Sequence, residues 1–308
     1  MARKLRVEYA GAIYHLMNRG DRREPIVKDE KDRRCFLATL GEACEKTGWQ
    51  VHAWCLMSNH FHLVVETPQP NLVAGMKWLL GTYTSRFNRR HKVFGHLFSG
   101  RYKSLIVDGS GNGYLKTVCD YVHLNPARAK LLKTEQKLSS YSWNSYRAYL
   151  APARRRPGWL RVDRLMAEHG IFRDSKEGRR EFGRRMELRR ISEEDPKQLK
   201  TLRRGWCLGS KEFRQELLAA MHDRAGANHG GEERKESEEA WARRLLAEGL
   251  RREGWAAADL AQRRKGDAGK VRMARRLRAE TTMTLNWIAK ELNMGAAGSL
   301  ANLLRKKK

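Results

Sequence analysis

The segment 57–66, with the sequence MSNHFHLVVE, carries two imidazoles at a spacing that can hold a metal ion. Side chains alternate between the two faces of a β-strand, so His60 and His62 lie on one face and the apolar residues around them lie on the other. Two imidazoles placed side by side can ligate one divalent cation. Two half-buried strand histidines that bond to their neighbours would show the same pattern. The pair therefore indicates a metal site only if other functional residues lie near it.

A second segment, CDYVHLNPARA, places a nucleophile beside an oxygen ligand. Tyr121 and Asn125 are four residues apart and therefore share one face of a predicted helix. Pro126 disfavours helical geometry at Asn125, so we expect the helix to end there with the Asn125 amide free to turn toward a site. Tyr114 lies seven residues before Tyr121 and is an alternative nucleophile on the same face.

Alternating strand and helix signals surround these residues over about the first 150 positions. Apolar runs predict strands, and apolar residues at helical spacing predict helices, in the order βαββαβα. The strands are expected at 12–17, 49–56, 60–67 and 101–107, and the helices at 29–47, 71–90 and 114–125. Gly48 is expected to cap the first helix, and Ser58-Asn59 to form a hairpin turn. The order predicts an α+β fold, with a ferredoxin-like antiparallel four-stranded sheet and helices packed on it.

The remainder of the chain predicts helices of two kinds. Residues 152–205 are dense in arginine and poor in large apolar residues, so we expect a linker and solvated helices; a helical stretch after Ser210 and a polar break at 226–239 follow. Near the end, 285–292 has helical spacing, 293–295 breaks it, and 300–304 begins another helix, which is typical of a helix-turn-helix. A helical hairpin docked on its own domain has the same pattern. The predicted division is 1–150 for the α+β domain that carries these segments, 151–239 for a basic linker and helical region, and 240–308 for a helical, helix-turn-helix-like DNA-binding region.

The composition favours a polyanionic partner. Among the 308 residues, 63 Lys and Arg stand against 35 Asp and Glu, a net charge of +28. So strong an excess repels itself unless a polyanion is close, which makes nucleic acid the leading partner. No apolar stretch approaches the roughly 18 residues of a membrane span, and no signal-peptide core follows the N-terminus, so we expect a cytoplasmic protein with no membrane partner. Five scattered cysteines predict neither a disulfide framework nor a zinc knuckle.

With these segments in view, the sequence resembles the REP-associated tyrosine transposases, members of the HUH superfamily of single-strand DNA nucleases. The likeness covers about the first 150 residues, and its matching stretches occur in the family's order. They are NRG at 18–20, WCLMSNHFH at 54–62, GHLFSGRYKS at 95–104 and YVHLNPARA at 121–129. Ala127 stands where valine is more common, a conservative departure.

The resemblance implies a reaction and a set of residues for it. His60 and His62 would bind a divalent cation, Mg or Mn, with Asn125 completing the site, and Tyr121 would attack the DNA. Glu66 is a second candidate for the third ligand, because it shares strand parity with both histidines. The implied activity is cleavage and rejoining of single-stranded DNA beside hairpin-forming palindromic repeats, through a 5'-phosphotyrosine intermediate. The resemblance leaves the oligomeric state, monomer or dimer, open.

Several residues are candidate DNA contacts. Asn18 and Arg19 match the family, and the basic side chains of Arg86, Arg89, Arg101 and Lys103 are placed to cradle a backbone. Tyr102 or Trp54 is a candidate for stacking on a base. For each residue singly, a solvated charge or a core aromatic is the alternative interpretation.

The sequence leaves two alternative functions. One is a non-catalytic regulator that binds DNA through the C-terminal helix-turn-helix; the presence of two histidines, an amide and a tyrosine together argues against it. The other is a zinc-dependent hydrolase, which lacks a third strong ligand at a familiar spacing.

Overall fold

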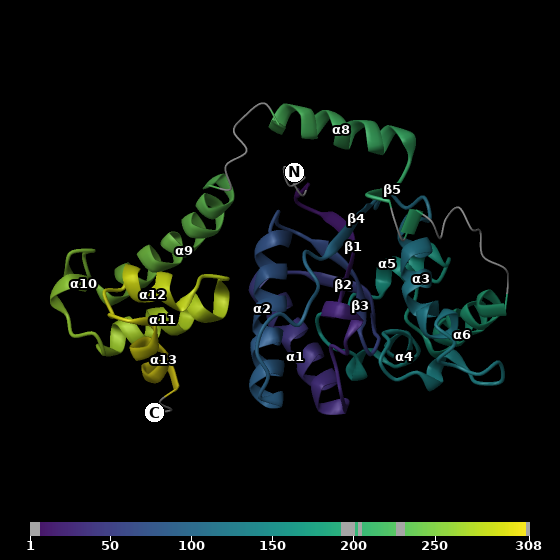
Figure 1. Cartoon of the computed structure of the whole chain (residues 1–308). Helices are drawn as coiled ribbons and strands as arrows, with labels where there is room; N and C mark the ends of the chain where they lie inside the picture. Colours follow the sequence, from purple (N-terminus) through teal and green to yellow (C-terminus); the bar gives the residue numbers. More distant parts are fainter. Residues whose placement is uncertain (1–6, 192–200, 203–204, 226–231, 306–308) are drawn as a thin grey trace. The chain divides into compact units, whose positions relative to one another are not determined.

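The computed structural model describes residues 7–191, 201–202, 205–225 and 232–305, and the chain divides into two compact units, Met1–Asp223 and Arg224–Lys308 (Figure 1). Unit 1 contains, in chain order, β1 (Ala12–Arg19), a 3-10 turn (Asp21–Arg23), α1 (Glu30–Thr47), β2 (Gln50–Leu56), β3 (His60–Thr67), α2 (Leu72–His91), β4 (Lys103–Val107), α3 (Tyr114–Arg128), α4 (Tyr146–Leu150), α5 (Asp163–Glu168), α6 (Lys176–Ile191), β5 (Cys207–Leu208) and α8 (Lys211–Ala225). Two further 3-10 turns lie at Leu138–Ser140 and Ala153–Arg155.

A five-stranded mixed sheet forms the centre of unit 1, in the order β2-β3-β1-β4-β5. The first four strands pair antiparallel, as the sequence predicts, and β3 begins at His60 and ends at Thr67 as expected. The prediction of a purely antiparallel, four-stranded sheet is wrong in one respect, because β5 adds a fifth strand parallel to β4. Two residues a hundred positions after β4 are too short a run to give a strand signal.

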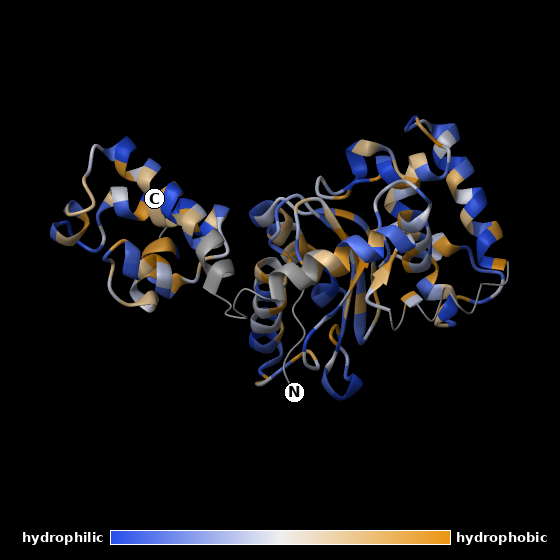
Figure 2. Cartoon of the chain, turned by 90° about the horizontal axis from the view of Figure 1, so that it is seen from above, coloured by the Kyte–Doolittle hydropathy of each residue, from blue (hydrophilic) through white to orange (hydrophobic). Residues whose placement is uncertain are grey.

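Helices cover both faces of the sheet (Figure 1). On one face, Phe61 and Leu63 of β3 join a core with residues of α1 and α2 such as Phe36 and Tyr83. On the other face, the alternate residues of the same strands, such as Val64, join a core with α3 to α6. The strands are accordingly rich in hydrophobic residues (Figure 2). Burial on both sides explains their nearly continuous apolar sequence.

The first helix begins and ends as its sequence indicates. The Asp29 side chain accepts a hydrogen bond from the backbone N–H of Asp32 and caps the N-terminus of α1. Gly48 ends the helix with φ of 71°, in the left-handed region that glycine adopts without strain.

The helix that carries Tyr121 does not end at Asn125, so that expectation is wrong. α3 runs through Pro126 to Arg128. Pro126 has no N–H to give to the preceding turn, but the backbone N–H of Ala129 still bonds to the Asn125 carbonyl at 2.9 Å. Burial of Leu124 and Pro126 against the core keeps the last turn in place.

The region after residue 150 differs from the predicted linker with solvated helices. Phe182 and Met186 of α6 are fully buried in the same core as α3, and Leu165 of α5 joins them. The arginines between them gave α6 a polar composition, and a few apolar residues on one face are enough to dock it. The compact unit therefore continues to Asp223, although residues 192–200 and 203–204 lie outside the described residues.

Unit 2 is helical. Its elements are α9 (Glu232–Glu253), α10 (Asp259–Gln262), α11 (Ala268–Glu280), α12 (Leu285–Glu291) and α13 (Ala297–Arg305). The expected polar break at 226–239 is shorter than predicted, because α9 begins at Glu232; residues 226–231 lie outside the described residues. Between α12 and α13, Asn293 and Gly295 have positive φ and turn the chain, and Leu292 and Leu300 pack in one core.

Two expectations from composition can be compared with the structure. All five cysteines are free thiols, and four of them are buried. Among the described residues, no helix is both long and apolar enough to cross a membrane. The N-terminal residues 1–6, on which the expectation of no signal peptide partly rests, lie outside the described residues.

Candidate active site

The pairing of β1 with β3 brings three histidines onto one face of the sheet. His60 lies opposite Arg19 and His62 opposite Met17, and both imidazoles lie on one face of β3, as predicted; α3 covers that face. His15, two positions before Met17, shares this face. The centroids of the His15 and His62 rings are 5.2 Å apart and nearly parallel, and the His60 and His62 rings are also 5.2 Å apart, edge to face.

Tyr121 of α3 completes this group of rings. Its ring lies edge-on to His62, with centroids 5.8 Å apart, and to His15, with centroids 5.7 Å apart. The Arg128 guanidinium covers the tyrosine ring at 4.3 Å from the centroid. We call His15, His60, His62 and Tyr121 the His-Tyr cluster. The structure thus brings together the predicted histidine pair on β3 and the predicted nucleophile on α3.

The three imidazoles are neutral at pH 7. Burial lowers the pKa of His60 to about 4, with a further contribution from the charge of Arg19. Burial also lowers the pKa of His15, to about 3, and that of His62 well below its ordinary value, the latter helped by the neighbouring histidines and arginines. A neutral imidazole has the lone pair that a metal ion needs.

Hydrogen bonds to the histidines select which nitrogen remains available. Nδ1 of His60 bonds to the side-chain oxygen of Asn59 at 2.7 Å, and Nδ1 of His62 bonds to Nε2 of His15 at 3.0 Å. Within the described part of the chain, Nε2 of His60 and Nε2 of His62 have no hydrogen-bond partner. Metal-binding histidines commonly use one nitrogen for the ion and anchor the other in this way.

The sequence offers Asn125 and Glu66 as candidates for the third metal ligand, and their hydrogen bonds in the structure differ. The Asn125 amide nitrogen donates to the Tyr121 carbonyl at 3.2 Å, which leaves its oxygen without a hydrogen bond from the described residues. Glu66 instead accepts hydrogen bonds from His52 at 2.9 Å and Arg164 at 2.9 Å. It lies four strand positions beyond His62, roughly 13 Å away, so it does not serve this site.

The donor set fits a divalent cation bound by mixed nitrogen and oxygen ligands. Two neutral imidazoles with free Nε2 atoms and an amide oxygen one helical turn from Tyr121 are suitable donors. Among the described residues, no group of three or more His, Cys, Asp or Glu side chains is arranged to hold a metal ion. The set therefore depends on Asn125 as well as on the histidines.

A family model matches the segment that carries these residues. Residues 8–125 match the family model described as "Transposase IS200 like". The segment is an IS200-like transposase domain. Among the curated proteins, none matches the chain. Among solved structures, the chain is similar to a REP-associated tyrosine transposase bound to a REP hairpin, with a TM-score of 0.41 and 12% sequence identity over 52% of this chain and 91% of that one.

Asp120, the neighbour of Tyr121, anchors the transposase domain to the helices after it. Its fully buried carboxylate accepts a hydrogen bond from His169 Nε2 at 3.0 Å and one from Arg189 Nη1 at 2.8 Å. These contacts join α3 to the end of α5 and to α6. They hold the helix that presents Tyr121, and neither Asp120 nor His169 is among the residues predicted from the sequence.

The predicted DNA contacts divide into two groups. Arg19, Arg89, Arg101 and Lys103 are exposed, and none forms a salt bridge among the described residues. Asn18 is only 6% exposed and lies opposite Phe61, on the face away from the histidines. Arg86 donates two hydrogen bonds to Glu42 of α1, at 2.7 and 2.9 Å, so its charge is already compensated. Asn18 and Arg86 are therefore weaker candidates for a phosphate contact than the four exposed cations.

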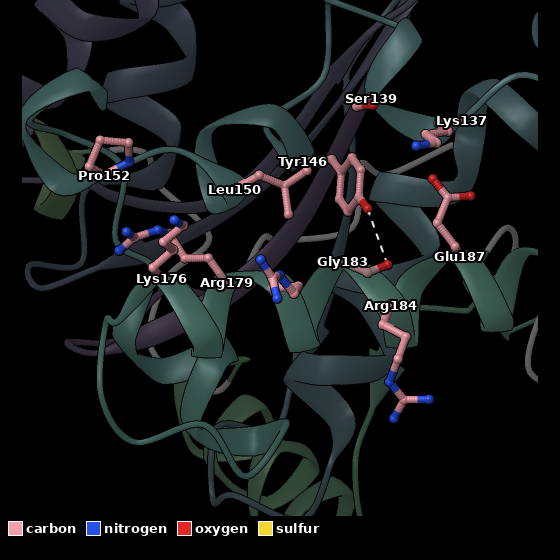
Figure 3. A pocket seen from close by; sticks show the side chains of 11 residues that line it. Lys137, Ser139, Tyr146, Leu150, Pro152, Lys176, Arg179, Gly183, Arg184 and Glu187 are labelled. Carbon is pink, nitrogen blue, oxygen red and sulfur yellow. Dashed lines mark hydrogen bonds between the residues drawn. The ribbon is translucent and has the colours of Figure 1, made fainter.

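A cationic hollow of about 650 Å³ lies elsewhere in unit 1 (Figure 3). Its floor includes Tyr146, whose hydroxyl donates to the Gly183 carbonyl at 3.4 Å. The lining residues are Lys137, Ser139, Tyr146, Leu150, Pro152, Lys176, Arg179, Arg180, Gly183, Arg184 and Glu187. None of them belongs to the His-Tyr cluster. Arg179 and Arg184 are paired with Asp174 and Glu181, so part of this charge is compensated locally.

His15 is the site residue that the sequence analysis missed. It is fully buried, bonds to His62 and contacts Tyr121. The segment AIYHLMNR has a strand pattern with one histidine on the less apolar parity, but only the register with β3 shows that His15 faces His62. A sequence without its strand pairing gives no signal for that contact.

Proposed function

We propose that this chain is a metal-dependent single-stranded DNA transposase that cleaves and rejoins DNA beside hairpins formed by palindromic repeats. The observation that carries the proposal is the packing of the Tyr121 ring against His62, with centroids 5.8 Å apart, on the face that also holds His60. A regulator or a purely structural domain needs no phenol beside a pair of neutral imidazoles. The IS200-like transposase domain at 8–125, which includes all of these residues, supports it.

Tyr121 is the proposed nucleophile. Its oxygen attacks the scissile phosphorus, a P–O bond to the phenol forms, and the bond from phosphorus to the 3' oxygen breaks. The phenol loses a proton and the leaving 3' oxygen gains one, so the products are a 5'-phosphotyrosine and a free 3'-hydroxyl. Because one phosphodiester has replaced another, the 3'-hydroxyl of a second strand can reverse the step and join new DNA without ATP.

His60, His62 and Asn125 are the proposed ligands of a divalent cation, Mg or Mn. When bound, such a cation withdraws charge from a phosphate oxygen and so makes the phosphorus easier to attack. The chain's own contribution is to keep both imidazoles neutral and to anchor their Nδ1 atoms on Asn59 and His15. Imidazole ligands suit Mn better than Mg, so Mn is the expected stronger activator.

DNA would bind through exposed cations of unit 1 and through unit 2. Arg19, Arg89, Arg101 and Lys103 are the proposed backbone contacts, consistent with the chain's net charge of +28. The proposed role of residues 240–308 is recognition of DNA by the helix-turn-helix of α12 and α13. The proposed role of residues 151–239 is to link the cleavage domain to this DNA-binding region. The substrate proposed from the family resemblance is a hairpin with single-stranded flanks.

The test is formation of a covalent adduct. The chain and its Tyr121→Phe variant are incubated with an end-labelled single strand that folds into a hairpin, with Mn present, and are then resolved on a denaturing gel. The proposal predicts a slower-migrating protein–DNA adduct with the parent and none with the variant. An adduct of equal yield in both proteins would refute Tyr121 as the nucleophile.

The second candidate function is a non-catalytic DNA-binding regulator, which the turn between α12 and α13 favours. Asn293 and Gly295 give that turn its positive φ values, and both helices pack on α11. Specific DNA binding without any adduct, across Mg, Mn and several hairpins, would support this alternative.

A further inference from the structure

Phe94 is the most exposed large apolar residue in the described part of the chain, with 98% of its surface open to solvent. It lies in the loop 92–102 between α2 and β4. Phe98, four residues later in the same loop, is buried and lies edge-on to Phe61, with ring centroids 5.9 Å apart. One aromatic of the loop therefore anchors it, and the other is presented to solvent.

The loop that carries Phe94 is held in place by hydrogen bonds. The Asn88 side chain donates to the Gly95 carbonyl at 3.0 Å. The backbone N–H of Asp21 donates to the Leu97 carbonyl at 2.9 Å, and that of Ser99 donates to the Arg19 carbonyl at 2.8 Å. The exposure of Phe94 thus belongs to a fixed loop, and a fixed aromatic is a better binding surface than a mobile one.

The same hydrogen bonds connect the loop to the candidate active site. Ser99 is bonded to Arg19, and Arg19 lies directly opposite His60 in the ladder between β1 and β3. The loop therefore lies beside the end of β1 and the start of β3, where the His-Tyr cluster begins.

The loop that carries Phe94 is positively charged. Residues 92–103 contain three exposed cations, Lys92, Arg101 and Lys103, and no acidic residue. None of these cations forms a salt bridge among the described residues. Next to the loop, Arg22 and Arg23 are exposed and have positive φ of 49° and 65°, a strained turn of the kind that is retained at functional sites.

An exposed aromatic ring in a cationic surface has the features of a stacking site for single-stranded DNA, because bases stack on the ring while phosphates pair with the cations. A surface that binds a protein partner would have further exposed apolar residues around Phe94. Within the described loop, Val93 is the only other exposed large hydrophobic residue. The two aromatics predicted from sequence to stack, Trp54 and Tyr102, are 6% and 9% exposed and cannot do so.

We propose that Phe94 binds an unpaired base of the single-stranded flank, by stacking, while Lys92, Arg101 and Lys103 take the adjoining phosphates. Its location beside the cleavage point rests on the proposed function. The binding itself does not require chemistry at Tyr121. This site has no counterpart among the residues that the sequence analysis selected for stacking.

The test uses full-length protein in the Tyr121→Phe background, so that binding is measured without cleavage. The probes are hairpin-forming single strands with 2-aminopurine at one unpaired flank position at a time, whose fluorescence is quenched by stacking. We expect quenching at one position, loss of that quenching and about tenfold weaker binding in Phe94→Ala, and recovery of both in Phe94→Trp. Phe172→Ala is the matched control, because Phe172 is also a highly exposed phenylalanine of unit 1, and it should bind as the parent does.

Three outcomes would overturn the proposal: unchanged binding and quenching in Phe94→Ala, an equal loss in Phe172→Ala, or no binding of any probe by the parent. Failure of the proposed function looks different. In that case no covalent adduct forms with wild-type Tyr121, while the Phe94-dependent quenching persists.

Discussion

Nε2 of His15 lies 3.0 Å from Nδ1 of His62, and the two buried rings are stacked on one face of the sheet. If Nδ1 of His62 carries the proton, it donates to His15 and leaves its own Nε2 lone pair for a cation. The buried Nδ1 of His15 has no hydrogen-bond partner among the described residues, so the bond to His62 is the one side-chain hydrogen bond of a ring that also packs against Tyr121. His15 is therefore a positioning residue for His62.

Replacing His15 should lower the affinity of the site for its metal ion more than it lowers the reactivity of Tyr121. In His15→Ala we expect the Mn concentration for half-maximal adduct formation to rise about 10- to 100-fold, since removing the partner of a metal-binding histidine has effects of this size. The measurement is adduct yield against Mn concentration. His52→Ala is the control, because His52 is equally buried but bonds to Glu66 at the other end of the strand. An unchanged Mn requirement in His15→Ala would contradict this role.

Asp120 should matter more for stability than any surface acid. Asp120→Ala removes one acceptor from the buried His169 and one from the Arg189 guanidinium, and the free energy of unfolding should fall by about 3 kcal/mol. Urea unfolding followed by circular dichroism measures this. Glu181→Ala, which removes an acid paired with Arg184 and Arg185 at the surface of α6, should keep the parent's unfolding midpoint. Equal midpoints for both variants would show that Asp120 does not anchor α3.

Glu66 should give the protein an acid-dependent stability. Burial raises the pKa of this carboxyl, but hydrogen bonds from His52 and Arg164 outweigh it and lower the pKa to about 2. The unfolded chain has the ordinary value of 4.5, so the stabilisation is complete above pH 4.5 and is lost as the pH falls from 4.5 toward 2. The Glu66→Gln variant lacks this contribution, and the difference in unfolding free energy between parent and variant should narrow over that range. A difference that stays constant from pH 7 to pH 3 would contradict the assignment.

Lys270 is the buried cation of unit 2. Its ammonium donates to the carbonyls of Leu260, Arg263 and Asn293, at 2.7, 3.0 and 3.3 Å, and so joins α10 and the turn after α12 to α11. Lys270→Met leaves these carbonyls without a donor, and we expect a loss of roughly 2 kcal/mol in unit 2. Hydrogen exchange of the α11 amides reports it, with the exposed Lys290→Met as control. Equal protection of α11 in the two variants would exclude this role.

Features of the fold and site that depend on local side-chain spacing could be predicted from the sequence. The alternation around His60 and His62 predicts the strand and its shared face, because side-chain parity is a local property. The helical spacing of Tyr121 and Asn125 is local too, and both prove to be on α3. By contrast, His15 and β5 depend on strand pairing, and the burial of α6 depends on where its two apolar residues dock. Pro126 misled the prediction because tertiary packing outweighs its local preference to end a helix.

The exposed residues illustrate the same limit. Arg86 and Arg89 are indistinguishable as charges in the sequence, yet Arg86 is paired with Glu42 and Arg89 is exposed. Phe94 and Phe98 are both aromatic residues of one short segment, and only the packing of Phe98 against Phe61 distinguishes the anchor from the exposed ring.

The central claim is that the Tyr121 oxygen becomes bonded to DNA. The most direct measurement is peptide mass spectrometry of the adduct formed with a hairpin-bearing single strand and Mn, after digestion with nuclease and protease. We predict a nucleotide phosphate attached through its 5' end to the peptide that contains Tyr121. Attachment to Tyr114 or to any other residue, or a cleaved strand with no modified peptide, would contradict the account.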